Sequence, residues 1–169
     1  MLWYVLLLAA IAAERVAELV VSRRNLAWSR ARGGVEFGAG HYPAMVVLHT
    51  ALLAGCLIEV IVFHRPFLPA LGWSMLAVVV AAQGLRWWCV STLGPQWNTR
   101  VVVVPGAARI DDGPYRFIAH PNYVAVVAEG IALPLVHTAW ITALVFTVLN
   151  AALLRTRIRT ENTALGALA

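Results

Sequence analysis

The residues best suited to catalysis or ligand binding form one short segment directly before an apolar run. Residues 112–123 read DGPYRFIAHPNY. His120-Pro121 predicts a helix start, because proline is tolerated at the first helical position. The next backbone N–H groups, at Asn122, Tyr123 and their neighbour, then lack helical partners and attract a carboxylate. His120 could accept a hydrogen bond, donate one or merely cap the helix. A chain that only spanned a membrane would not need this chemistry.

A lone carboxylate, Glu129, follows inside the apolar run, two helical turns after Pro121. An ionisable group within a membrane span is costly and normally has a partner or a task. Glu129 should therefore face the interior of a helix bundle. It either pairs with an arginine or a backbone donor, or it takes part in the chemistry.

Other charged residues interrupt apolar runs with less functional weight. Glu14 and Glu18 share a helix face, and Arg15 stands three residues before Glu18, which suits an internal ion pair in the first helix. Glu59 and Arg86 stand near the ends of their runs, where long side chains can reach the membrane surface. We therefore expect little from Glu59 and Arg86.

The C-terminal tail carries a further acidic residue in an apolar setting. Residues 157–165, RIRTENTAL, continue the last helix, and Glu161 interrupts its apolar stripe. With Glu161 on the same side of the membrane as His120, the tail would close a pocket, and Arg157, one turn earlier, would orient the carboxylate. The alternative is a surface i,i+4 pair between Arg157 and Glu161.

The composition defines the class of protein that must position these residues. Hydrophobic residues make up 61% of the 169 residues and charged residues 12%, which indicates an integral membrane protein. No dense basic run with interleaved aromatic residues occurs, so nucleic acid is not an expected partner. Cys56 and Cys89 lie in apolar runs without disulfide or metal-ligand spacing. They should be small buried residues, and no metal is expected.

The apolar stretches predict an all-α, polytopic membrane protein with about five transmembrane helices in a single domain. The fourth helix is short for a full crossing. The stretches lie near residues 2–22, 42–63, 69–90, 121–136 and 138–155.

The arginines predict the orientation of these helices. Ten of them follow the first, third and fifth stretches, whereas Arg65 alone falls in the opposite connections. By the positive-inside rule, the amino terminus should lie outside and the carboxyl terminus in the cytoplasm. The site near His120 should therefore face the cytoplasm.

The one long irregular connection, residues 91–119, should have structure of its own. Val101 to Val104 read as an extended run that ends at Pro105-Gly106, and Asp112-Gly113-Pro114 reads as a second turn. Long connections of this kind are usually functional.

Four blocks of this half together resemble the isoprenylcysteine carboxyl methyltransferase family of integral membrane methyltransferases. The resemblance covers roughly residues 85 to 165. Ala119 and Asn162 depart from it, since the family usually has Arg and a second Glu there. The blocks are TLGPQW at 92–97, GPYR at 113–116, HPNY at 120–123 with Glu129, and RIRTENTAL at 157–165.

The amino-terminal half resembles one bacterial subgroup of that family, which is associated with type III polyketide synthases. The similar segments are ER and EL at 14–15 and 18–19, SRRN at 22–25, and GGVEFGAGHYP at 33–43, with His49. Members methylate oxygen atoms on long-chain alkylpyrones or alkylresorcinols. The resemblance thus implies a bacterial cytoplasmic membrane, a lipophilic acceptor that enters from the bilayer, and a type III polyketide synthase as a partner.

The resemblance implies S-adenosyl-L-methionine as the methyl donor, bound at the cytoplasmic edge by residues 91–169, with residues 1–90 as the substrate side. No Gly-rich strand-to-helix turn occurs, so the dinucleotide-type methyltransferase fold is not expected. Glu161 would accept from ribose hydroxyls or the amino group, and Tyr115 and Trp97 either flank the cofactor or pack the core. The implied cofactor residues are His120, Pro121, Asn122, Tyr123, Tyr115, Gly113, Trp97, Arg157 and Glu161.

Methyl transfer from a sulfonium is an in-line displacement, so it requires alignment, desolvation and a deprotonated acceptor. A phenol with a pKa of about 10 would profit from a general base, whereas the enol of a hydroxypyrone arrives ionised. Glu36, His41 and Glu129 are the candidate catalytic residues, as base or orienting group.

Three functions remain open at this point. The first is O-methylation of a long-chain phenolic or pyrone lipid. The second changes the acceptor to a thioether-lipidated carboxylate or a phospholipid amine. The third is a non-enzymatic membrane carrier or scaffold, whose embedded charges serve packing or ion passage.

Overall fold

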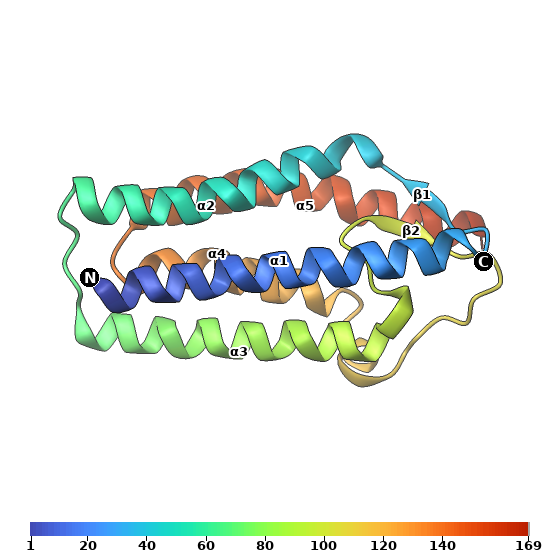
Figure 1. Ribbon diagram of the computed structural model, residues 1–169, viewed down its shortest axis with the longest axis horizontal. Coiled ribbons are helices and arrows are strands. Elements are labelled where there is room, and N and C mark those ends of the chain that lie inside the picture. Colours follow the sequence, from blue (N-terminus) through green and yellow to red (C-terminus); the bar gives the residue numbers. More distant parts are fainter. Residues whose placement is uncertain (169) are drawn as a thin grey trace.

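The structure is a computed structural model that describes residues 1–168, and its architecture there is a bundle of five helices (Figure 1). The all-α architecture predicted from the apolar stretches is confirmed. The helices are α1 Leu2–Arg30, α2 Tyr42–Val62, α3 Pro69–Leu93, α4 Pro121–Leu135 and α5 Trp140–Leu168.

Three of the helices are long and apolar enough to cross a membrane, judged by length and composition. These stretches are Ala39–Val62, Pro69–Gln96 and Trp140–Gly166. The charges of α1 interrupt its apolar surface, and α4 has only 15 residues, as expected for the short fourth helix. The chain is a polytopic, all-α membrane protein.

Helix α4 lies between α3 and α5 and packs against both. Its contact with α5 depends on a glycine: a Cβ at Gly130 would lie 2.1 Å from the Phe146 ring, so a larger residue would have to displace that ring. This contact joins the second half of α4 to the first turns of α5. Both elements carry residues of the predicted site.

A short two-stranded antiparallel sheet joins two connections at one end of the bundle. Strand β2, Val101–Val103, confirms the predicted extended run before Pro105. Its partner β1, Val35–Phe37, was not predicted, and Glu36 pairs with Val102 in the register. Figure 1 places this sheet beside the C-terminal part of α5. We call this end of the bundle the strand end.

Helix α1 continues beyond the first apolar stretch, which ends near residue 22, as far as Arg30. The extension anchors the connection that follows α3. The Ser22 and Thr99 hydroxyls lie 2.8 Å apart, and Asn25 Nδ2 donates to the carbonyl oxygens of Gly94 and Trp97 at 3.0 and 2.7 Å. Polar residues of α1 thus hold one wall of the site in place.

The expectation that Glu59 and Arg86 matter little was wrong. Each is only 4% exposed. Glu59 accepts from the backbone N–H groups of Ile141 and Thr142 at 3.2 and 2.7 Å, which satisfies donors in the first turn of α5. It also accepts from Arg65 Nε at 3.0 Å. The long side chains remain inside because their partners lie on other helices.

The two cysteines agree with the prediction. Cys56 and Cys89 are fully buried, and both are free thiols. They act as small core residues of α2 and α3.

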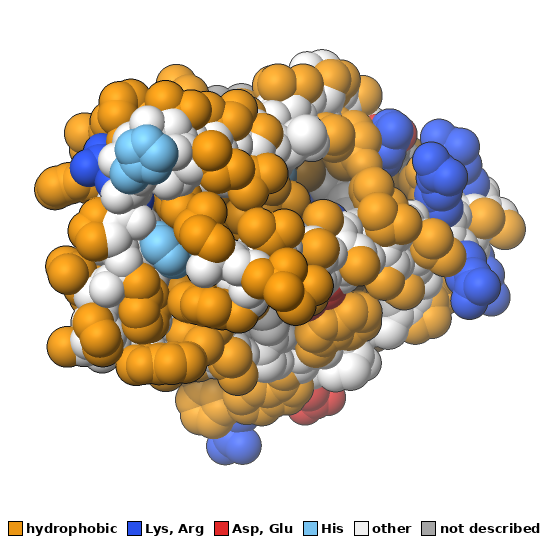
Figure 2. All heavy atoms as spheres, turned by 60° about the vertical axis from the view of Figure 1, so that its left-hand side comes forward, with side chains coloured by type: hydrophobic (Ala, Val, Ile, Leu, Met, Phe, Trp, Pro, Cys, Tyr) orange, Lys and Arg blue, Asp and Glu red, His pale blue; other side chains and the backbone are white. Residues whose placement is uncertain are grey.

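The outer surface has the pattern of a membrane protein. Figure 2 shows hydrophobic side chains over most of the visible face, with most of the visible arginines gathered toward the strand end. The C-terminal end of α1, the α3–α4 connection and the C-terminal end of α5 all lie there, whereas Arg65 lies in the α2–α3 connection at the other end. The predicted sharing of one end by the three arginine-rich segments is therefore confirmed.

Candidate functional site

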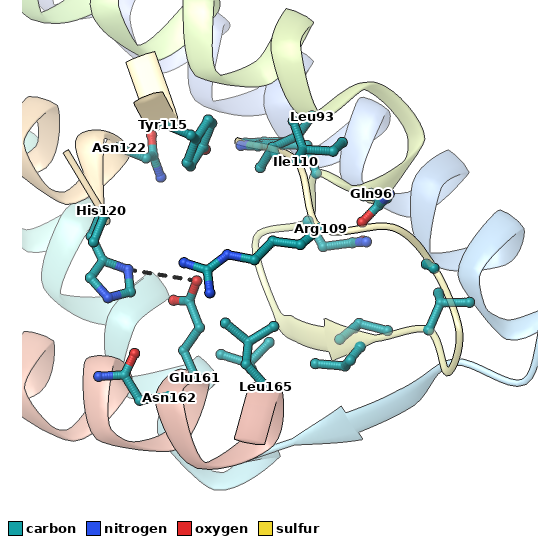
Figure 3. A pocket seen from close by; sticks show the side chains of 18 of the residues that line it. Leu93, Gln96, Arg109, Ile110, Tyr115, His120, Asn122, Glu161, Asn162 and Leu165 are labelled. Atoms are coloured by element: carbon teal, nitrogen blue, oxygen red, sulfur yellow. Dashed lines mark ion pairs between the residues drawn. The ribbon is translucent and has the colours of Figure 1, made fainter. Parts of the chain in front are cut away.

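A cavity of about 580 Å³ opens at the strand end, between the start of α4, the C-terminal turns of α5 and the 94–119 connection. We call it the polar cavity, because charged and amide side chains from all three elements line it (Figure 3). Among its lining residues are Trp97, Asn98, Arg109, Tyr115, Ala119, His120, Asn122, Tyr123, Arg157, Glu161 and Asn162.

The start of α4 and the tail of α5 meet in this cavity. Helix α4 begins at Pro121, directly after His120, as predicted. His120 Nδ1 lies 3.7 Å from Glu161 Oε1 (Figure 3), and the Tyr123 hydroxyl donates a hydrogen bond to the other carboxylate oxygen. The His120 and Tyr123 rings stack with their centroids 5.3 Å apart. The two predicted halves of the site are therefore in direct contact.

Arg157 stabilises this arrangement through two hydrogen bonds. Its Nε donates to the Tyr123 hydroxyl at 2.9 Å and its Nη2 to the Thr99 carbonyl at 2.6 Å. Arg157 is 6% exposed, and within residues 1–168 it forms no ion pair with Glu161. The alternative of a surface i,i+4 pair is therefore wrong, since Tyr123 stands between the two charges.

The free backbone donors at the start of α4 are fewer than predicted. The Tyr123 N–H donates to the His120 carbonyl at 3.1 Å, so it is already used. No side chain caps the helix. Nearby, the buried Oδ1 atoms of Asn98 and Asn122 have no hydrogen-bond partner within the described chain. Buried acceptors of this kind are costly unless a ligand or water donates to them.

Two predicted cofactor residues lie behind the wall of the cavity, and their structural roles are clear. Gly113 has φ +55°, and a Cβ there would lie 2.5 Å from Thr92 Oγ1, so only glycine fits the turn before Tyr115. Pro121 is fully buried and begins α4. Neither residue lines the polar cavity.

The two predicted aromatic walls do line the cavity. Trp97 is 3% exposed and Tyr115 is half-buried. Burial raises the pKa of the Tyr115 phenol above its ordinary value, and the neighbouring Cys89 acts in the same direction. Tyr115 therefore stays a neutral hydrogen-bond donor.

Ala119 and Asn162, which depart from the family pattern, both line the polar cavity. Arg109, in the 94–119 connection, lines the same cavity with a largely exposed side chain. Figure 3 shows Arg109 pointing toward the His120–Glu161 pair. Arg109 also forms an ion pair with Asp111 at 3.1 Å.

A second cavity, of about 480 Å³, lies deeper in the bundle. We call it the apolar cavity, since aliphatic side chains of α1, α2, α4 and α5 make up much of its lining. The two cavities have five lining residues in common, which we call the shared wall. They are Trp97, Asn98, Asn122, Tyr123 and Arg157.

The three candidate catalytic residues are not brought together. Glu36, on β1, lies 2.6 Å from Arg100 Nη1, and His41 directly precedes α2. Glu129 is 5% exposed and lies 2.6 Å from Arg86 Nη2, so it has the arginine partner that was one of its two interpretations. None of the three lines either cavity.

The sequence interpretation missed Asn98 and the apolar cavity. A polar Asn98 between Trp97 and Thr99, in a connection already expected to be functional, was an available signal for the former. The apolar cavity had none, because its lining comes from all five helices and from residues 97–99, which are distant in sequence.

Comparison with known proteins defines the class. The chain matches the isoprenylcysteine carboxyl methyltransferase (ICMT) family over residues 75–167, the half that builds the polar cavity. The chain belongs to this family of membrane methyltransferases.

Two further relatives match nearly the whole chain. It is 37% identical to the uncharacterized protein YpbQ of Bacillus subtilis over 166 residues, which cover 98% of this chain and 96% of that protein. It is 25% identical to an uncharacterized protein of Haemophilus influenzae over the same shares. No solved structure matches the chain.

Proposed function

We propose that the protein is an S-adenosyl-L-methionine-dependent O-methyltransferase whose acceptor is a long-chain alkylpyrone or alkylresorcinol. The observation that carries the proposal is the shared wall. A polar cavity in the family-matched half and an apolar cavity within the bundle have Asn122, Tyr123 and Arg157 in common. A water-soluble donor and a lipid acceptor could each occupy a matching environment and meet there.

The polar cavity fits the chemistry of the cofactor. Its volume lies within the range of about 300–1,000 Å³ that small-molecule sites have. The unpartnered Oδ1 atoms of Asn98 and Asn122 suit hydroxyl or ammonium donors. Glu161 suits a ribose diol or an amino group, and the start of α4 suits a carboxylate. Aromatic faces such as Trp97 and Tyr115 attract a sulfonium cation.

When bound, S-adenosylmethionine supplies an electrophilic methyl group for in-line displacement by an oxygen nucleophile. The chain's own contribution is alignment and exclusion of water. Arg157 and Glu161 both hydrogen-bond the Tyr123 hydroxyl, which orients that ring in the shared wall.

Arg157 also favours an ionised acceptor oxygen. Its guanidinium is buried. It donates to Tyr123 on α4 and to the Thr99 carbonyl of the 94–119 connection, and both of these partners are neutral. A positive charge beside a hydroxyl lowers the pKa of that hydroxyl. A phenol or enol at the shared wall would therefore lose its proton more readily, without a carboxylate base in contact with it.

The charge distribution supports placement of the site in the bacterial cytoplasm. The arginine-rich strand end would face inward, with the amino terminus outside. A type III polyketide synthase could then deliver its product to the inner leaflet, from which the acceptor enters the apolar cavity between helices.

The test uses the full-length chain purified in detergent with methyl-labelled S-adenosylmethionine. The acceptors are a 6-alkyl-4-hydroxy-2-pyrone, a 5-alkylresorcinol, N-acetyl-S-farnesylcysteine and phosphatidylethanolamine. Label in the pyrone or resorcinol supports the proposal. Label only in the farnesylated carboxylate or the phospholipid would overturn the acceptor class, and failure to bind the cofactor would overturn the activity.

A further inference from the structure

We infer that Arg15, Glu18 and Arg86 form a recognition site for a second hydroxyl on the acceptor ring, which narrows the acceptor to a resorcinol-type head. The inference rests on the proposed function, because it assigns the inner end of the apolar cavity to the acceptor. All three side chains line that cavity.

These residues belong to a buried ion network that connects three helices. Arg15 Nη1 lies 2.9 Å from Glu18 Oε2 on α1, and Arg86 Nη2 of α3 lies 2.6 Å from Glu129 Oε2 of α4. Arg15 Nη2 approaches Glu129 at 3.5 Å. Glu129 does not line the cavity, but it contacts and positions both guanidinium groups that do.

Three polar atoms of the network remain without a hydrogen bond. Within residues 1–168, Arg15 Nε, Arg86 Nε and Glu18 Oε1 are buried and have no hydrogen-bond partner. Arg86 Nε and Glu18 Oε1 lie 3.5 Å apart as an ion pair. Glu18 and Arg86 are 5% and 4% exposed, so bulk water does not satisfy these atoms. Buried polar atoms without a hydrogen bond are costly, and a ligand that forms hydrogen bonds with them recovers part of that cost.

The charge of the network selects a neutral group. Arg15 and Arg86 are balanced by Glu18 and Glu129, and Glu14, 3.4 Å from Arg15, adds a further negative charge. A carboxylate or phosphate would find no net positive charge here. The free positions are two N–H donors and one carboxylate acceptor, and a hydroxyl can both accept and donate. A carbonyl could use only the donors.

The apolar cavity contains both this network and the shared wall, so one acceptor ring in it would present one oxygen substituent to each. One hydroxyl of a resorcinol would lie at the shared wall for methylation while the other lies near Glu18. The product would therefore be a monomethyl ether with its free hydroxyl at the network.

The test compares two lipids that differ by one hydroxyl, 5-pentadecylresorcinol and 3-pentadecylphenol. Their affinities are measured by calorimetry in detergent, with the full-length chain saturated by S-adenosylhomocysteine so that no turnover occurs. A hydrogen bond to a charged group predicts that the resorcinol binds about 10- to 100-fold more tightly. Glu18→Gln should reduce this ratio to about twofold, because the acceptor charge is lost.

Glu59→Gln is the matched control, measured below its unfolding midpoint, since Glu59 is also a buried carboxylate but lines neither cavity. Its affinity ratio should equal that of the wild type. Equal affinity of both lipids for the wild type, or an unchanged ratio in Glu18→Gln, would overturn the inference while the proposed function stands. Absence of S-adenosylhomocysteine binding by the wild type would instead overturn the proposed function itself.

Discussion

The Tyr123 hydroxyl on α4 donates a hydrogen bond to the Glu161 carboxylate on α5. The same hydroxyl accepts from Arg157 Nε at 2.9 Å. One phenol therefore connects the proline-initiated helix to the C-terminal tail, two segments that are 38 residues apart in the chain. Its ring also belongs to the wall between the two cavities.

Tyr123→Phe should weaken cofactor binding. The substitution keeps the ring but removes the hydroxyl that connects Arg157 to Glu161, so Glu161 is held less well for the cofactor and the Kd should rise by about fivefold or more. Calorimetric titration with S-adenosylmethionine measures it. Tyr4→Phe is the control, because it removes a buried tyrosine hydrogen bond, to the Leu133 carbonyl, at the opposite end of the bundle. A Kd for Tyr123→Phe equal to that of Tyr4→Phe would contradict the role of the link.

His120→Ala and Glu161→Ala should each weaken cofactor binding by about tenfold or more, because each removes a polar group that lines the cavity. Since the two side chains are in contact, their effects should not add in the double variant. Asp112→Asn is a suitable control, as an exposed carboxylate on the neighbouring connection that does not line the cavity. An unchanged cofactor affinity in both single variants would contradict the assignment of the polar cavity as the cofactor site.

Glu129→Gln should slow turnover with little change in cofactor affinity. The carboxylate positions Arg86 and Arg15 but lines neither cavity. Loss of its charge leaves two buried guanidinium groups less well held, so the acceptor is aligned less well. Steady-state kinetics should give a lower kcat at an unchanged Kd for the cofactor, and Glu129→Asp should partly restore kcat. A cofactor Kd that rises in parallel with the loss of rate would argue against this role.

Glu59→Gln should destabilise the fold without affecting the site. Glu59 is buried, pairs with Arg65 and satisfies the first turn of α5, so neutralising it should cost about 3 kcal/mol. The measurement is the thermal unfolding midpoint in detergent, with the cofactor Kd determined well below that midpoint. An unchanged midpoint would mean that the capping interaction contributes nothing. A changed Kd would mean that the two ends of the bundle are coupled.

The elements that the sequence predicts well are those with a local signal. Pro121 after His120 defines the start of α4, and Pro105-Gly106 ends strand β2. Apolar runs locate the helices because a membrane span needs continuous hydrophobicity. The end of α1 is different: Arg23 and Arg24 end the apolar run but are good helix formers, so the helix continues past them.

The features that the sequence does not reveal depend on partners from distant segments. Glu59 is buried because α5 supplies N–H groups 82 and 83 residues further along the chain. Strand β1 is three residues long, too short for a periodicity, and forms only because β2 is adjacent. The positions of Glu36 and Glu129 away from both cavities likewise follow from tertiary packing. Residue type alone made them equal candidates with His41.

Hydrogen–deuterium exchange with and without S-adenosylhomocysteine, analysed by mass spectrometry, tests the central claim most directly. The full-length chain in detergent should show slower exchange on binding at residues 119–124 and at residues 157–166, the two segments that meet in the polar cavity. Residues 63–68, the α2–α3 connection at the opposite end, serve as the internal control. Protection confined to the amino-terminal helices, or no protection at saturating ligand, would contradict the account.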